Sequence, residues 1–214
     1  MREKILAHMG SLLGGVVHNL NTPLMWVMGR AQIVQSRMER APALGDLTEE
    51  EFASLREKCL RDIASIIEGA EKIDTILKGL GYKIQMVTEG FGAVELREYL
   101  EMETNFLMAD MRFKHDTTRV VDLGNSSHYT KVDYNALSAA VTGVIGTMLD
   151  HTAKGRTITV SLKGGVIHLG CPQLSLDDVS GPRVHDALGA IAGHADVHVD
   201  DADGLVVTIA IRER

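Results

Sequence analysis

The chain has 214 residues, of which 45% are hydrophobic and 24% are charged, and its formal net charge is −7. This length and composition indicate a soluble globular protein of two modest domains, or of one domain with a helical extension. The negative charge argues against nucleic acid or an anionic membrane as the main partner, because both attract concentrated positive charge. No apolar run reaches the roughly 18 residues that a membrane span needs. The two distant cysteines, Cys59 and Cys171, match no metal spacing, so reduced thiols and a cytoplasmic location are expected.

The first segment, from about Glu3 to Glu39, has the periodicity of one long amphipathic helix. Its apolar residues are alternately three and four positions apart, which is the spacing of a helical-bundle seam. They are Leu6, Met9, Leu13, Val16, Leu20, Val27, Ala31, Val34 and Met38. This register places His18 opposite the seam, with Thr22 one turn later on the same exposed face.

Three residues near His18 weaken such a helix. Gly14 and Gly15 each cost about 0.5–1 kcal/mol relative to alanine, and Pro23 costs about 3 kcal/mol or more in a helix interior. A helix that served only to pack would not need them. We therefore interpret the glycines as baring the surface beside His18, and the proline as bending the helix, for docking of another protein's active site.

The residues from His18 to Leu24 are His-Asn-Leu-Asn-Thr-Pro-Leu. This stretch resembles the H-box of bacterial sensor histidine kinases: His, an acidic residue, any residue, Arg or Asn, Thr or Asn, Pro, Leu. Only Asn19 departs from that pattern. The resemblance implies that His18 accepts a phosphoryl group, with Asn19, Asn21 and Thr22 as further site residues. Thr22 corresponds to the position that orients a water for dephosphorylating the receiver, although a simple role on the helix surface is an equal alternative.

The second helix is predicted after a break at residues 41–46. It opens with Thr48 and Glu51 as a capping box. Its apolar stripe comprises Phe52, Leu55, Cys59, Ile63, Ile66, Ala70, Ile73, Leu77 and Leu80, with one irregularity near Asp62. Two long helices cannot bury such stripes well by themselves, whereas two copies of the hairpin can, so we predict a homodimeric four-helix bundle. The alternative is a monomer in which a second domain covers the hairpin.

The second half of the chain predicts an α/β domain with a mixed sheet. We expect helices at 92–109, 133–149 and 182–192, and strands at 84–88, 157–162, 166–169, 197–199 and 205–211. Short strands or irregular segments are expected at 112–115 and 119–121. The fold class is therefore α+β, with residues 1–82 forming the phosphotransfer hairpin and residues 83–214 a sandwich domain. The order of elements resembles the catalytic, ATP-binding domain of histidine kinases.

The nucleotide motifs of that family are missing from this second domain. Gly143 and Thr147 occupy the places of the two asparagines, one of which holds magnesium in the family. The segment after Leu169 lacks the aspartate and glycines of the adenine-contacting turn, and Ser180-Gly181 leads into the next helix without a Gly-x-Gly lid. We therefore predict the fold without its ATP site: no bound cofactor, no metal site, and magnesium supplied by a partner's receiver domain.

Asn19 agrees with this prediction, because the family's acidic residue acts as a base during attack on ATP and an asparagine cannot. Exchange with a receiver aspartyl phosphate needs only an exposed neutral imidazole. The resemblance thus implies a histidine phosphotransferase whose partners are response-regulator receiver domains, with ATP-dependent autophosphorylation not expected. Two alternatives remain: a divergent ATP-dependent kinase core, and a non-enzymatic pseudokinase that binds a response regulator.

Overall fold

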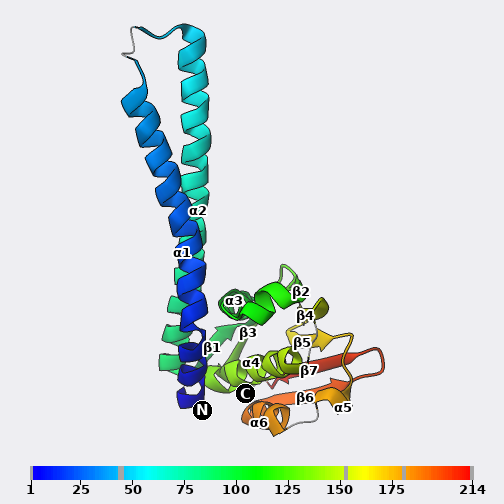
Figure 1. The fold of residues 1–214 in the computed structure, drawn as a ribbon. Coiled ribbons are helices and arrows are strands. Elements are labelled where there is room, and N and C mark those ends of the chain that lie inside the picture. The colour runs from blue at the N-terminus through cyan, green and yellow to red at the C-terminus, as the bar shows by residue number, and fades with distance from the viewer. Residues whose placement is uncertain (1, 43–45, 152–153, 180–181, 213–214) are drawn as a thin grey trace. The chain divides into compact units, whose positions relative to one another are not determined.

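The computed structural model describes residues 2–42, 46–151, 154–179 and 182–212 (Figure 1). Contacts divide the chain into two compact units, one of Val16–Lys78 and the other of Met1–Gly15 together with Gly79–Arg214. Within the described residues, no helix combines the length and the apolar character that a membrane span requires. The domain ranges 1–82 and 83–214 remain a prediction.

The two long helices of the N-terminal half are formed as predicted. Helix α1 is Arg2–Arg40 and helix α2 is Glu49–Glu89. The capping box is also present, because the Glu51 amide donates to Thr48 Oγ1 at 3.2 Å and the Thr48 amide donates to Glu51 Oε2 at 3.0 Å. These bonds satisfy backbone donors that the first turn of a helix otherwise leaves unpaired.

Within the unit Val16–Lys78, one buried carboxylate joins the two helices. Asp62 of α2 is 4% exposed, and it accepts hydrogen bonds from the guanidinium groups of Arg30, at 2.9 Å, and Arg37. This explains the irregular position in the α2 apolar stripe. A polar residue at a seam position fixes helix register, because a shifted register would leave its charge unpaired.

The second unit contains a two-stranded and a five-stranded sheet with helices on one side (Figure 1). Strand order in the larger sheet is β2-β4-β5-β7-β6, with β2 parallel to β4 and the other pairs antiparallel. The elements are β1 (Phe91–Glu95), α3 (Leu96–Leu107), the π-helical turn η2 (Arg112–Asp116), β2 (Thr117–Asp122), β3 (Tyr129–Asp133), α4 (Tyr134–His151), β4 (Arg156–Lys163), β5 (Val166–Cys171), α5 (Leu176–Val179), α6 (Pro182–Ile191), β6 (Ala195–Asp200) and β7 (Leu205–Ile211). A long hairpin followed by a mixed α/β domain is the architecture that the sequence predicts.

The core of this unit lies between the five-stranded sheet and its helices. Alternate residues of the central strands are buried, as a sheet with one covered face requires. Those at the sheet centre are Ile158, Val160, Ile167, Leu169, Val207 and Ile209, and none is more than 1% exposed. Helix α4 supplies the facing apolar layer through residues such as Leu137, Val141, Ile145 and Met148.

A buried ion pair connects the last turns of α2 to this core. Lys83 and Glu103 are each 1% exposed and form a direct salt bridge. Lys83 Nζ also donates to Ser138 Oγ at 3.1 Å, and the Tyr134 hydroxyl donates to the Glu103 carboxylate at 3.4 Å. The charges are thus paired and hydrogen-bonded, which is the condition under which burial of two ions is tolerated.

Three local predictions are wrong. Residues 84–88 belong to α2 and not to a strand, because Lys83 and Val87 are buried one turn apart, which continues the helical packing face. Phe91–Glu95 pairs with β3 as strand β1, so the helix predicted from residue 92 begins at Leu96. Arg112–Asp116 is a π-helical turn where a short strand or an irregular segment was expected. The other predicted helices and strands are present.

Candidate functional site

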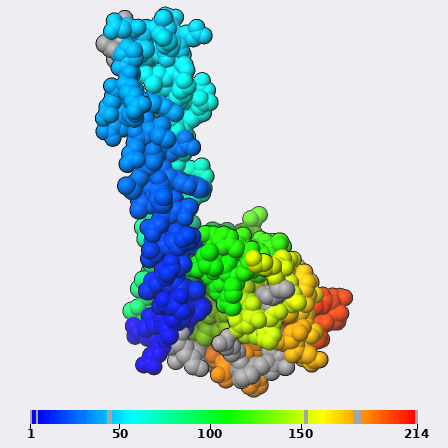
Figure 2. Space-filling model, in the orientation of Figure 1, coloured from blue at the N-terminus to red at the C-terminus, as the bar shows by residue number. Residues whose placement is uncertain are grey.

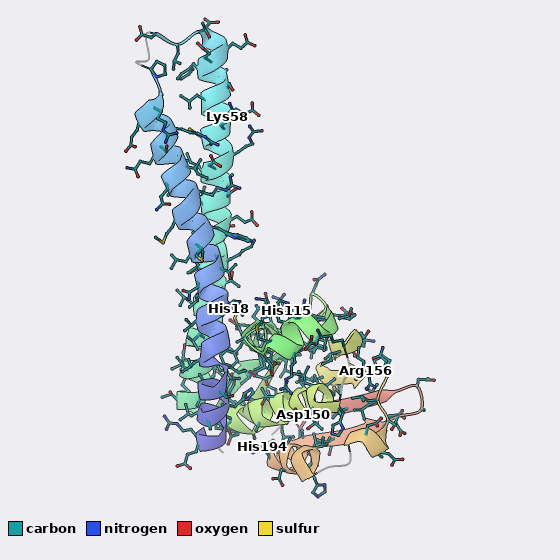
Figure 3. All side chains as sticks on the ribbon, in the orientation of Figure 1. His18, Lys58, His115, Asp150, Arg156 and His194 are labelled. Atoms are coloured by element: carbon teal, nitrogen blue, oxygen red, sulfur yellow. The ribbon has the colours of Figure 1, made fainter. Side chains whose placement is uncertain are left out.

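His18 lies on α1 within the unit Val16–Lys78, and its side chain is exposed (Figure 3). Thr22 and Asn21 are exposed as well, whereas Asn19 is half-buried. The Thr22 hydroxyl donates to the His18 carbonyl at 3.3 Å, so its oxygen remains able to accept a hydrogen bond. The imidazole is therefore open to solvent, as the predicted register requires, with Thr22 one turn away on the same side of the helix.

Pro23 marks a level at which the two helices approach closely. It is buried, and α1 continues through it as helix. A Cβ added at Gly69 of α2 would lie 3.3 Å from the Pro23 carbonyl oxygen and 2.7 Å from Val27 Cγ2. Gly69 therefore allows close helix packing immediately after the segment that carries His18.

The two glycines before His18 have different surroundings. A Cβ at Gly14 would meet no atom within 4 Å, which agrees with a bared surface. A Cβ at Gly15 would lie 1.9 Å from the carbonyl oxygen of Ala109, just beyond α3. Gly15 is thus required by packing against that backbone, and our interpretation of it as part of an open docking surface is wrong.

The apolar residues of α1 form two stripes rather than one. Ile5, Met9, Leu12 and Val16 are buried, each less than 9% exposed. The other stripe of α1 remains exposed, and in the unit Val16–Lys78 it includes Val17, Leu24, Met28 and Met38. Helix α2 of the same unit also has exposed apolar residues, which are Phe52, Leu60, Ile63, Ile67 and Leu77. Together these residues of α1 and α2 form the exposed apolar stripe. Figure 2 shows one face of these helices in space-filling form. A helix turns about 100° per residue, so the side chain of His18 points away from both α1 stripes.

Helix α6 packs directly on α4 at Gly143, one of the two positions where the sequence resemblance would place a magnesium-site asparagine. A Cβ at Gly143 would lie 2.4 Å from the Ala187 Cβ. The Thr147 hydroxyl donates to the Gly143 carbonyl at 2.9 Å and so bonds its own helix. Neither position carries the asparagine side chain that the resemblance would place there.

The segment after β5 is used for structural contacts. Gln173 Oε1 accepts from the Thr157 amide at 3.0 Å, and the Leu174 carbonyl accepts from the Leu205 amide at 2.8 Å. Burial raises the pKa of the Cys171 thiol, so this group stays protonated at neutral pH. Ser180 and Gly181, where the sequence lacks the lid of the family that it resembles, lie outside the described residues.

No group of three His, Cys, Asp or Glu residues is placed to hold a metal ion among the residues that the structure describes. Sequence reasoning missed another set of polar residues, His8, Asp110, Arg112 and Asp150, which line one cavity in the second unit. No spacing rule could have joined them, because they come from α1, the segment after α3, and α4.

Comparison with known proteins returns only structural similarities. No family model and no curated protein matches the chain. The chain is similar to the cytoplasmic segment of histidine kinase QseC, with 14% identity, a TM-score of 0.47, and coverage of 58% of this chain and 79% of that one. It is also similar to the Acinetobacter baumannii histidine kinase AdeS, with 14% identity, a TM-score of 0.43, and coverage of 92% and 98%.

A third similar structure is the catalytic domain of histidine kinase ThkA, with 12% identity, a TM-score of 0.44, and coverage of 57% of this chain and 97% of that one. All three solved structures are of histidine kinases, and those of QseC and ThkA are a cytoplasmic segment and a catalytic domain. All three have TM-scores below 0.5.

Proposed function

We propose that this chain is a phosphorelay histidine phosphotransferase in two-component signalling. His18 receives a phosphoryl group from the aspartyl phosphate of one receiver domain and passes it to the aspartate of another. The observation that carries the proposal is a contrast between the two units. The H-box-like segment presents an exposed imidazole, whereas the positions that correspond to a kinase's magnesium site are Gly143 and Thr147, occupied by helix packing and a backbone hydrogen bond.

The transfer uses the lone pair of one imidazole nitrogen. That nitrogen attacks phosphorus, an N–P bond forms, and the P–O bond to the receiver aspartate breaks, so that the aspartate leaves as a carboxylate. Magnesium bound by the receiver offsets the negative charge on the phosphoryl oxygens. No protein base is needed to start the reaction when the imidazole is neutral, which is consistent with Asn19 in place of an acidic residue.

The exposed apolar stripe supports a homodimer as the working form. Large apolar surfaces on both helices of the unit Val16–Lys78 are exposed, among them Ile63 at 41% and Ile67 at 53%. Contiguous exposed apolar patches of this kind mark interaction surfaces. A second copy would bury the stripe in a four-helix bundle, while His18, outside the stripe, would stay accessible to a receiver.

The proposal is tested by offering the protein two phosphoryl donors. Wild type and His18→Ala are incubated with radiolabelled ATP and magnesium, and separately with receiver domains that carry a labelled aspartyl phosphate. We expect label on wild type from a receiver only, and none on His18→Ala. Label from ATP would identify a divergent kinase core instead. Stable receiver binding without any His18-dependent label would identify a pseudokinase.

A further inference from the structure

Helix α1 runs without a break over Arg2–Arg40, but its two parts belong to different units (Figure 1). Residues Met1–Gly15 belong to the same compact unit as the two β-sheets, whereas the helix from Val16 onwards belongs to the other unit. Residues 17–22, all of which the structure describes, include no buried residue. His18 lies in this stretch, so its helical conformation depends on the segments before and after it.

The first turns of α1 are held through one face of the helix, which we call the anchored face. Its members have the three- and four-residue spacing of an amphipathic helix, and they are Ile5, His8, Met9, Leu12 and Gly15. The apolar side chains among them are each less than 9% exposed. Ile5 lines one cavity together with Leu107 of α3 and Leu149 of α4. A Cβ at Gly15 would collide with the carbonyl of Ala109, so this close approach requires glycine.

This first segment is a poor helix by itself. It contains Gly10, Gly14 and Gly15, and glycine loses more backbone entropy on entering a helix than any other residue. Isolated helices shorter than about 12–15 residues are only marginally stable in water, even when they are rich in alanine. The helical form of residues 2–15 therefore depends on the packing of the anchored face.

Thr22 and Pro23 offer a second place at which a helix can begin. Threonine is a favoured N-cap residue, and proline is favoured at the first helical position, where its missing N–H costs nothing. In the continuous helix the Thr22 hydroxyl instead bonds the His18 carbonyl at 3.3 Å, and Pro23 gives no N–H to the preceding turn. The helix from Pro23 onwards is held separately, by close packing at Gly69 and by the ion pairs of Asp62.

We propose that α1 has two helical forms, one that begins at Arg2 and one that begins at Pro23, and that the anchored face selects the longer form. In the shorter form residues 2–21 are unwound, Thr22 becomes the N-cap, and His18 lies in the unwound segment. Release of the anchored face thus removes His18 from the helix. The consequence for phosphoryl transfer rests on the proposed function, whereas the existence of the two forms does not.

Hydrogen–deuterium exchange of the full chain tests this proposal, because the exchange rate of a helix amide reports the opening that exposes it. Exchange is compared between residues 5–22 and residues 26–40 of α1 at one fixed protein concentration. In wild type we expect residues 5–22 to exchange faster than residues 26–40 by about tenfold or more, with the boundary at Pro23.

Two substitutions shift the balance between the two forms in opposite directions. Thr22→Val keeps a β-branched side chain but removes the cap that only the shorter form uses, so exchange of residues 5–22 should become slower, by about 2- to 30-fold. Leu12→Ala removes a buried contact of the anchored face, so exchange of the same residues should become about tenfold faster or more. Leu13→Ala is the matched control, because Leu13 is 50% exposed, and it should change exchange much less. Residues 26–40 should exchange as in wild type in all three variants.

Three results would overturn the proposal: equal exchange on both sides of Pro23 in wild type, unchanged or faster exchange of residues 5–22 in Thr22→Val, or equal effects of Leu12→Ala and Leu13→Ala. Circular dichroism establishes whether Leu12→Ala is folded. If it is not, Thr22→Val still decides the outcome. Phosphoryl transfer to His18 is measured separately, so failure here leaves the proposed function untouched.

Discussion

The adjacent glycines of α1 offer a matched pair of substitutions with opposite expected effects. Gly14→Ala adds a methyl group where no atom lies within 4 Å, so the helix gains about 0.5–1 kcal/mol of stability from the lower backbone entropy of alanine. Gly15→Ala makes the same gain but places its Cβ 1.9 Å from the Ala109 carbonyl oxygen and 2.8 Å from the carbonyl carbon. These are backbone atoms, so helix or loop must move, at a cost of about 1–3 kcal/mol.

The assay is urea unfolding of wild type and both variants, followed by circular dichroism at one fixed protein concentration, because the proposed dimerisation would make stability depend on concentration. We expect Gly14→Ala to raise the free energy of unfolding and Gly15→Ala to lower it. Equal stabilisation by both would show that Gly15 does not contact the Ala109 backbone. Equal destabilisation would show that α1 is not a regular helix at this point.

Three further changes test the fold and the proposed dimer. Lys83→Met should lower the free energy of unfolding by about 3–5 kcal/mol, because it leaves the Glu103 carboxylate buried without its partner. The double variant, Lys83→Met with Glu103→Leu, should recover much of that loss in the same unfolding assay. The pKa of His8 is lowered in the folded chain, so the unfolded chain takes up a proton first as pH falls below 6.5. The free energy of unfolding of wild type should therefore decrease between about pH 7 and 5 more than that of His8→Gln. Equal pH profiles of the two proteins would contradict this. Ile67→Glu should convert the proposed dimer to a monomer, as measured by light scattering. Arg61→Glu is the control and should not do so, because Arg61 is exposed and lies away from the apolar stripe. A dimer that survives Ile67→Glu would exclude this interface.

Local chemistry made much of the fold predictable. The capping box at Thr48 and Glu51 starts α2, and Asp133 caps α4 by accepting from the amides of Asn135 and Ala136. The turn between β4 and β5 was predictable as well, since Gly164 and Gly165 both have positive φ angles that other residues rarely adopt. In each case the signal lies within a few residues of the structure that it specifies.

The features that sequence did not reveal depend on contacts between distant residues. A strand was predicted at 84–88, but burial of Lys83 against Glu103, 20 residues later, extends α2 through this segment. The irregular position at Asp62 was visible, yet its partners Arg30 and Arg37 become evident only when α1 and α2 are paired. The exposure of His18 was predictable from periodicity, whereas the packing of Ala187 of α6 against Gly143 was not.

The most direct test of the proposed function is the origin of the phosphoryl group on His18. Wild type is mixed with a panel of phosphorylated receiver domains or with ATP and magnesium, and label that is stable in base but labile in acid is then counted, as expected for phosphohistidine. We predict His18-dependent label from at least one receiver, its onward transfer to a second receiver, and none from ATP. Label from ATP that disappears in His18→Ala would contradict the proposal, and so would the absence of label from every receiver.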